Sequence, residues 1–159
     1  MFWAVFDSPI GEFSVATDGT GICGGRFGLV DGAATEPGDE LLQAAMTELR
    51  AYFAGELTAF TVPLSVRGGT DFERAVWREM RSIPYGETRT YGAVAKAVGD
   101  PGAARAVGVA CNRNPLPVIV PCHRIVGAGG KLVGFGGGLD RKVQLLELEA
   151  RVAWQRTWS

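Results

Sequence analysis

The stretch that decides the fold and chemistry of this chain is Val118-Ile119-Val120-Pro121-Cys122-His123-Arg124. His123 is the only histidine among 159 residues, and it directly follows one of only three cysteines. A thiol becomes a strong nucleophile as its thiolate, and a neighbouring imidazole can take its proton near neutral pH. The apolar run before the pair is strand-like, and a glycine-rich stretch, residues 127–138, follows it. The pattern indicates a nucleophilic cysteine under a loop that can wrap a ligand; the alternative is a buried structural cysteine beside a surface histidine.

The flanking residues extend this stretch into a longer motif. Residues 119–126 read IVPCHRIV, Asn114-Pro115 precedes them, and a helix ending in Glu149 follows them. This motif resembles the active-site motif of the O6-alkylguanine-DNA alkyltransferases, also called methylated-DNA–protein-cysteine methyltransferases. The resemblance runs from about Thr70 to Ala150, and the residues before it are similar only in overall layout.

The resemblance implies direct-reversal DNA repair, in which an alkyl group moves from O6 of guanine, or from O4 of thymine, to Cys122. A thioether has a very poor leaving group, so the transfer would be single-turnover and irreversible. His123 would take the thiol proton through one water, and Glu149 would fix the imidazole tautomer. Tyr91 matches a family tyrosine that hydrogen-bonds the flipped base, and Lys142 matches a lysine on the last helix of the family. No cofactor and no metal are implied.

A base inside a duplex is out of reach, so the resemblance also implies base flipping. Arg105 would intrude into the base stack, and Asn114 would brace the turn that leads to the thiol. The chain departs from the family at Phe135, where relatives often have tyrosine, and the small residues around it leave room for alkyl groups larger than methyl. The residues predicted to bind DNA are Arg105, Ala103, Ala104, Gly108, Asn114, Arg124, Phe135 and Gly136.

The predicted helix over residues 102–112 carries its own argument for DNA. It consists almost entirely of small residues, with Arg105 as its one long side chain before Cys111. A helix with side chains is roughly 10–12 Å across, whereas the minor groove is about 6 Å wide. A helix whose side chains are mostly small can come closer to the minor groove of double-stranded DNA. The alternative is that the helix packs tightly on a neighbouring helix, which gives the same sequence pattern.

The net charge of −1 hides an asymmetry between the two parts of the chain. Residues 1–66 hold two arginines against nine acidic residues, which gives −7. Residues 67–159 hold 14 basic residues against eight acidic ones, which gives +6. A basic part beside an acidic part is expected where one domain meets a polyanion, although ordinary solvated charge remains an alternative.

Composition narrows the class of protein. Hydrophobic residues make up 47% of the chain, which is enough for a core, and no run of 18 apolar residues predicts a membrane span. Three scattered cysteines and one histidine fit neither a disulfide framework nor a structural zinc site. A nucleophilic thiol needs a reducing compartment, so we expect a cytoplasmic protein. We expect a monomer that requires no protein partner.

The sequence predicts an α+β fold of two small domains, residues 1–66 and 67–159, with Arg67-Gly68-Gly69 at the boundary. In the first, strands over 2–6, 13–17, 21–27 and 60–66 and a helix over 39–53 form an antiparallel sheet with a helix, and the resemblance makes this domain ribonuclease-H-like. The second is a winged-helix-like domain with a helix-turn-helix. Its helices are predicted from Thr70, which forms a capping-box pattern with Glu73, over 91–98, where Thr90 is the expected cap, and over 102–112. The last helix is predicted over 140–150, where Leu139, Val143, Leu146 and Ala150 form the expected buried stripe.

Three other interpretations remain at this stage. A non-transferring relative that binds alkylated DNA would replace the reactive cysteine, so Cys122 argues against it. A winged-helix regulator would carry an inert cysteine. A cysteine hydrolase would use the Cys-His pair but would explain neither the basic domain nor the helix of small residues.

Overall fold

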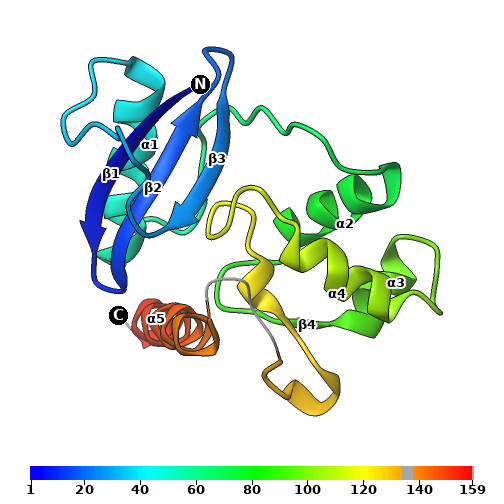
Figure 1. Cartoon of the computed structure of the whole chain (residues 1–159). Helices are drawn as coiled ribbons and strands as arrows, with labels where there is room; N and C mark the ends of the chain where they lie inside the picture. Colours follow the sequence, from blue (N-terminus) through cyan, green and yellow to red (C-terminus); the bar gives the residue numbers. More distant parts are fainter. Residues whose placement is uncertain (134–137, 159) are drawn as a thin grey trace. The chain divides into compact units, whose positions relative to one another are not determined.

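The computed structural model describes residues 1–133 and 138–158. The chain divides into two compact units, Met1–Arg67 and Gly68–Ser159 (Figure 1). The first contains a three-stranded antiparallel sheet and one long helix, and the second is mainly helical. This confirms the predicted α+β class. Within the described part of the chain, no helix is both long enough and apolar enough to cross a membrane.

The sheet of the first unit is a meander in the order β1-β2-β3. Its strands are β1 (Phe2–Ser8), β2 (Gly11–Thr17) and β3 (Ile22–Phe27). The pairing of β1 with β2 runs from Phe2 opposite Thr17 to Ser8 opposite Gly11. Gly11 has a φ of 106°, which side chains of other L residues rarely adopt, so a glycine suits this tight turn.

Helix α1 (Glu40–Phe53) packs against the sheet and closes the core of the first unit (Figure 1). Asp39 caps it by accepting a hydrogen bond from the backbone nitrogen of Leu42, at 3.0 Å. Its apolar stripe is buried as the helical spacing predicts. The buried residues are Leu42, Ala45, Met46, Leu49, Tyr52 and Phe53.

The predicted strand over residues 60–66 is wrong. Only an isolated parallel bridge between Ile22 and Leu64 forms there. The backbone nitrogen of Ile22 donates to the Pro63 oxygen, and the nitrogen of Ser65 donates to the Ile22 oxygen. Pro63 has no N–H to continue a ladder, so the alternating pattern yields an extended segment beside β3 instead of a strand.

In the second unit, three helices pack on one another: α2 (Asp71–Arg81), α3 (Tyr91–Ala97) and α4 (Ala104–Asn112). Thr70 and Glu73 form the predicted capping box at the start of α2. The indole nitrogen of Trp77 donates to the Ala110 oxygen at 2.8 Å, which joins α2 to α4.

A short parallel pair links the start of α3 to the residues after the cysteine. Strand β4 (Arg89–Thr90) pairs with β5 (Ile125–Val126), with Arg89 opposite Ile125. A single 3₁₀ turn, η1 (Cys122–Arg124), precedes β5, and a second, η2 (Ala128–Gly130), follows it. Tyr91 directly follows β4 and the cysteine turn directly precedes β5, so the pairing brings the start of α3 close in space to the cysteine motif.

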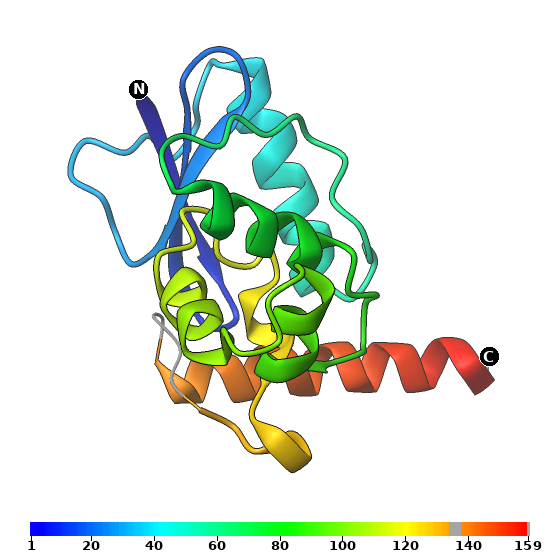
Figure 2. The same cartoon turned by 90° about the vertical axis from the view of Figure 1, so that its right-hand side faces the viewer.

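The last helix, α5 (Leu139–Trp158), has 20 residues and forms the long orange-to-red helix in Figure 2. It continues well past the predicted end at Ala150. The expected buried stripe is also wrong, because Leu139 is 46% exposed and Ala150 is exposed. The buried face instead holds Lys142, Leu145, Leu148, Glu149 and Val152. Hydrophobicity alone misplaced this face because two of its members are charged.

Candidate active site

The turn before the cysteine is held by Asn114. Its amide nitrogen donates to the Val120 oxygen at 2.8 Å, and its amide oxygen accepts from the Leu116 nitrogen at 2.9 Å. Between these anchors, Val118 is buried and has a φ of 74°. A left-handed conformation costs a β-branched residue roughly 1–2 kcal/mol. The apolar run is therefore a braced, strained turn and not the expected strand.

His123 is fully buried and faces Glu149. Its Nε2 lies 2.6 Å from a carboxylate oxygen of Glu149. A carboxylate accepts hydrogen bonds, so Nε2 carries the proton and Nδ1 holds the free lone pair. Nδ1 is buried and has no hydrogen-bond partner among the residues that the structure describes. The histidine thus presents a proton acceptor to the interior of the site.

Burial, with the charges of Arg124 and Lys142, lowers the pKa of His123, although Glu149 opposes this change. For Glu149 itself, burial would raise the pKa, but the hydrogen bonds and charges of His123 and Arg124 outweigh burial and hold it low. The two directions agree with a neutral imidazole beside an ionised carboxylate at neutral pH. A neutral imidazole is the form that can accept a proton.

Arg124 lies in this buried centre. Its Nε and Nη2 donate to the two oxygens of Glu149 at 2.8 and 3.0 Å, and its Nη1 donates to the Ile83 oxygen at 2.8 Å. Its guanidinium also lies over the ring of Tyr85, 5.6 Å from the centroid. These contacts commit a buried side chain to Glu149, so the structure does not place Arg124 at a DNA-facing surface.

Cys122 begins the 3₁₀ turn and is buried. Burial raises the pKa of its thiol, whereas a hydrogen bond from Asn114 and the positive charge of Lys142 lower it. The net direction is upward, so the resting thiol keeps its proton at neutral pH. The site therefore needs a base to form the thiolate.

Lys142 is a buried cation that ties three segments together. Its Nζ donates to the Ile125 oxygen at 2.6 Å and to the Val133 oxygen at 3.1 Å, and it lies 5.9 Å from the ring centroid of Tyr91. Burial lowers its pKa, and the neighbouring Cys111 and Cys122 oppose that change. The lysine thus places positive charge near the thiol and fixes the segments around it.

Tyr91 and Cys111 complete the surroundings of the thiol. Burial, followed by the charges of Cys111 and Cys122, raises the pKa of Tyr91 to about 12, so its hydroxyl stays protonated as a donor. Burial likewise raises the pKa of Cys111 to about 12, with Cys122 adding to the change. Cys111 thus lies near the thiol of Cys122, a neighbour that the sequence alone did not indicate.

Helix α4 carries the predicted DNA-binding residues. Arg105 is exposed, while Ala103, Ala104 and Gly108 are partly buried. Gly108 packs near Tyr91, since a Cβ built on it would lie 3.9 Å from the tyrosine ring. The remaining predicted positions, Phe135 and Gly136, lie outside the described residues.

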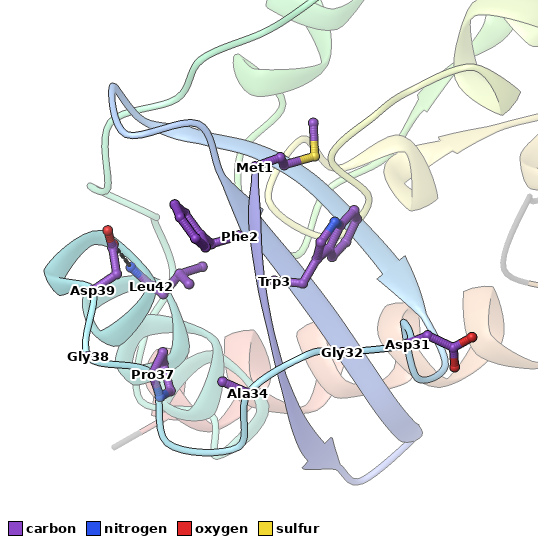
Figure 3. Close-up of a pocket in the computed structure, with 10 residues that line it drawn as sticks. All are labelled: Met1, Phe2, Trp3, Asp31, Gly32, Ala34, Pro37, Gly38, Asp39 and Leu42. Atoms are coloured by element: carbon purple, nitrogen blue, oxygen red, sulfur yellow. Dashed lines mark hydrogen bonds between the residues drawn. The ribbon is translucent and has the colours of Figure 1, made fainter.

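The structure thus brings Cys122, His123, Glu149, Lys142, Tyr91, Asn114 and Arg124 together in the second unit. A separate cavity of about 510 Å³ in the first unit is lined by Phe2, Trp3 and Leu42, among others (Figure 3). Among its described lining residues there is no cysteine or histidine, so it offers no comparable chemistry. Across residues 1–133 and 138–158, no three His, Cys, Asp or Glu side chains are grouped to hold a metal ion.

A buried cysteine beside a histidine that a carboxylate holds gives the second unit a centre suited to nucleophilic chemistry at a thiol. Comparison with known proteins agrees. The family model described as "6-O-methylguanine DNA methyltransferase, DNA binding domain" matches residues 71–151, and that of the "ribonuclease-like domain" matches residues 1–66. The chain belongs to the 6-O-methylguanine DNA methyltransferase family.

Individual relatives match over nearly the whole chain. A methylated-DNA–protein-cysteine methyltransferase of Methanosarcina acetivorans is 47% identical and covers 94% of this chain and 98% of its own length. One of Mycobacterium bovis is 49% identical, with 94% and 92% covered. The crystal structure of Mycobacterium tuberculosis OGT in complex with DNA superposes with a TM-score of 0.87 at 48% identity, covering 96% of this chain and 94% of that one.

Proposed function

We propose that this protein repairs alkylated DNA by moving the alkyl group to its own Cys122. The observation that carries the proposal is the buried Cys122-His123-Glu149 centre, within a chain whose family membership is established over both domains. The substrate is O6-alkylguanine in double-stranded DNA, with O4-alkylthymine as a second substrate. The protein acts as a monomer and needs no cofactor or protein partner.

The reaction begins with loss of the thiol proton. The Nδ1 lone pair of His123 accepts it through one bridging water, because neighbouring side chains in sequence diverge. Glu149 accepts the Nε2 proton, which keeps the tautomer correct and stabilises the imidazolium that forms. Lys142 stabilises the thiolate by its charge. Each of these groups lowers the cost of making an anion at a buried sulfur.

The transfer step is a displacement at saturated carbon. The sulfur–carbon bond forms as the bond between carbon and O6 breaks, and the electron pair goes to the departing purine. The proton that left the thiol finally neutralises the guanine. Tyr91 keeps its hydroxyl proton and donates a hydrogen bond to the leaving purine. A thioether is then left on Cys122, so each molecule reacts once.

Arg124 acts as a positioning residue in this scheme, in place of the DNA contact expected from the sequence. Its two hydrogen bonds to Glu149 hold the carboxylate where His123 can use it. Asn114 similarly holds the strained turn before Cys122. Arg124 thus acts through the carboxylate of Glu149, and Asn114 acts through the backbone that leads to Cys122.

DNA reaches the site through α4. Its exposed Arg105 enters the base stack as the damaged nucleotide flips out, and Ala103, Ala104 and Gly108 let the helix approach the minor groove. Phe135 and Gly136 are also proposed to contact DNA. The free state of all three cysteines suits a reducing compartment, and we assign the protein to the cytoplasm.

The test is a stoichiometry experiment. Protein is mixed with an excess of a duplex that holds one O6-methylguanine, and the loss of the lesion is followed by nucleoside chromatography. The proposal predicts loss of one equivalent of lesion per protein and then no further reaction. Tight binding without loss of the lesion would instead favour a non-transferring lesion-binding protein, and repeated turnover would exclude a self-alkylating mechanism.

A further inference from the structure

Helix α4 presents more than Arg105 on its exposed face. Val109 lies one helical turn after Arg105 and is 54% exposed, and Asn112 lies almost another turn along and is exposed. Val107 and Ala110 point to the opposite side and are buried. Positions i, i+4 and i+7 share one helix face, so Arg105, Val109 and Asn112 form a line. We call these three residues the α4 line.

The α4 line differs in chemistry from the rest of its helix. The helix otherwise consists of alanine, glycine, a buried valine and a buried cysteine. At Val109 the exposed face carries two methyl groups, and at Asn112 an amide that can both donate and accept hydrogen bonds. These side chains lie beside the arginine that is proposed to enter the base stack.

The minor groove offers a single feature that such side chains can distinguish. A·T and T·A pairs present only acceptors there, the adenine N3 and the thymine O2, whereas a G·C pair adds the 2-amino group of guanine. Methyl groups pack against an A·T floor but lie against the polar amino group of a G·C floor. The amide of Asn112 can donate to N3 or O2 of a pair farther along the groove than the one that the valine contacts.

Resting on the proposed function, we propose that Val109 and Asn112 make repair depend on the base pairs next to the lesion, with A·T pairs favoured. Helical rise places Val109 about 6 Å and Asn112 about 10.5 Å from Arg105 along the axis. Base pairs are about 3.4 Å apart, so the two residues reach positions roughly two and three base pairs from the flipped nucleotide. The contact of Val109 and Asn112 with these base pairs therefore changes which lesions are repaired fastest and leaves the chemistry at Cys122 unchanged.

The experiment compares three sets of duplexes, each with one O6-methylguanine. The pairs two and three positions away on both sides are A·T, G·C or inosine·C, where inosine is guanine without its 2-amino group. The rate of transfer is measured at protein concentrations below saturation. We expect A·T and inosine·C duplexes to react about fivefold faster than G·C duplexes, which is the effect of one net hydrogen bond.

Weaker flanking base pairs could also make the lesion easier to flip out. Protein variants are therefore needed to separate recognition of these pairs from the stability of the duplex. The double variant Val109→Ala, Asn112→Ala removes both side chains from an exposed helix face, where alanine is a good helix former. It should react at similar rates on all three sets. Leu29→Ala trims an apolar side chain that is 58% exposed in the first unit, and it should keep the wild-type preference.

Several results would overturn the inference. Equal wild-type rates on A·T and G·C duplexes would do so, as would inosine·C behaving like G·C. A preference that persists in the double variant would assign the effect to duplex stability and not to α4. Absence of transfer on every duplex would overturn the proposed function, and this inference with it.

Discussion

The two compact units bury different kinds of polar side chain. Among the described residues of Met1–Arg67, the buried polar groups are the hydroxyls of Ser14 and Thr17. In Gly68–Ser159 they are Glu73, His123, Arg124, Lys142 and Glu149. Burying charge is costly unless each charge is paired and hydrogen-bonded. Among its described residues the first unit buries no whole charged residue, whereas four of the five in the second unit lie around one thiol.

The contrast explains why chemistry belongs to the second unit. Four of its buried titratable groups, His123, Arg124, Lys142 and Glu149, contact one another or act on the pKa of Cys122 or of its base. In the first unit, Asp18 accepts hydrogen bonds from Ser65 and Arg67, and these join the turn after β2 to the end of the unit. A similar set of polar contacts thus serves structure in one unit and reactivity in the other.

Replacing the acceptor should have the largest effect. Cys122→Ser should abolish transfer and leave binding to lesion-containing duplex intact, because a hydroxyl has a pKa far above that of a thiol. Transfer is measured as loss of the lesion, and binding by fluorescence anisotropy. The matched control is Cys23→Ser, in the first unit, which should transfer at the wild-type rate. A Cys122→Ser protein that still removes the methyl group would show that another residue is the acceptor.

His123→Gln should slow transfer by about 10²–10⁴-fold, which is the usual contribution of a general base. Burial lowers the pKa of His123 below its ordinary 6.5, and only the neutral ring accepts a proton. The wild-type rate should therefore fall as the pH drops through a value below 6.5, and this limb should be absent in the variant. The measurement is the single-turnover rate against pH. An unchanged profile in the variant would remove His123 from the mechanism.

The variants Glu149→Gln, in the second unit, and Glu48→Gln, in the first, compare the loss of stability when a carboxylate is neutralised in each unit. Removing the charge of Glu149 leaves Arg124 buried without its counter-ion, which should cost about 3–5 kcal/mol of stability. Glu48 accepts hydrogen bonds from the Thr61 and Val62 nitrogens at an exposed edge, so its change should cost about 1 kcal/mol. Denaturant unfolding measures both values. Equal losses would contradict the contrast between the units.

Arg105→Ala should separate base flipping from chemistry. Transfer from duplex DNA should fall on the order of tenfold, because unstacking a base costs a few kcal/mol and the arginine offsets part of that cost. Transfer from a free O6-alkylguanine base should not change, since that base needs no flipping. Rates on both substrates are compared in one series. Equal losses on the two would contradict the flipping role.

Acid should loosen the second unit before the first. A native His123 with a lowered pKa binds protons less readily than the unfolded chain, so stability falls as the pH drops below 6.5. Glu149 adds a further loss below its ordinary 4.5, whereas the lowered pKa of Asp18 in the first unit matters only below 3.8. Between pH 7 and 5, the protection of backbone amides from hydrogen exchange, taken relative to the intrinsic exchange rate at each pH, should fall in α5 before it falls in α1. The reverse order would contradict this assignment.

Local patterns in the sequence were enough for much of this architecture. The capping box at Thr70, the cap at Thr90 and the apolar stripe of α1 depend on neighbouring residues and formed as predicted. The strand over residues 60–66 failed because Pro63 cannot continue a ladder, and a strand's existence depends on its partner. The positive φ of Val118 was not predictable, because a β-branched residue rarely adopts it and the hydrogen bonds of Asn114 that hold it form only on the folded backbone.

The sequence was enough to predict which residues form the site, but not how all of them are oriented. The motif and the family resemblance brought in Cys122, His123 and Glu149, which the structure places together. Arg124 was placed among the residues expected to bind DNA, yet the carboxylate of Glu149 holds it inside. The buried face of α5 was misplaced for the same reason: hydrophobicity cannot identify a face that buries Lys142 and Glu149.

The most direct test of the central claim is peptide mass mapping after reaction with a duplex that holds O6-methylguanine. The three cysteines lie in distinct sequence contexts, so their peptides can be told apart. The account predicts that the peptide with Cys122 alone gains the mass of one methylene group, while those with Cys23 and Cys111 stay unchanged. A gain at Cys111 or Cys23, or no gain on a protein that has removed the lesion, would contradict it.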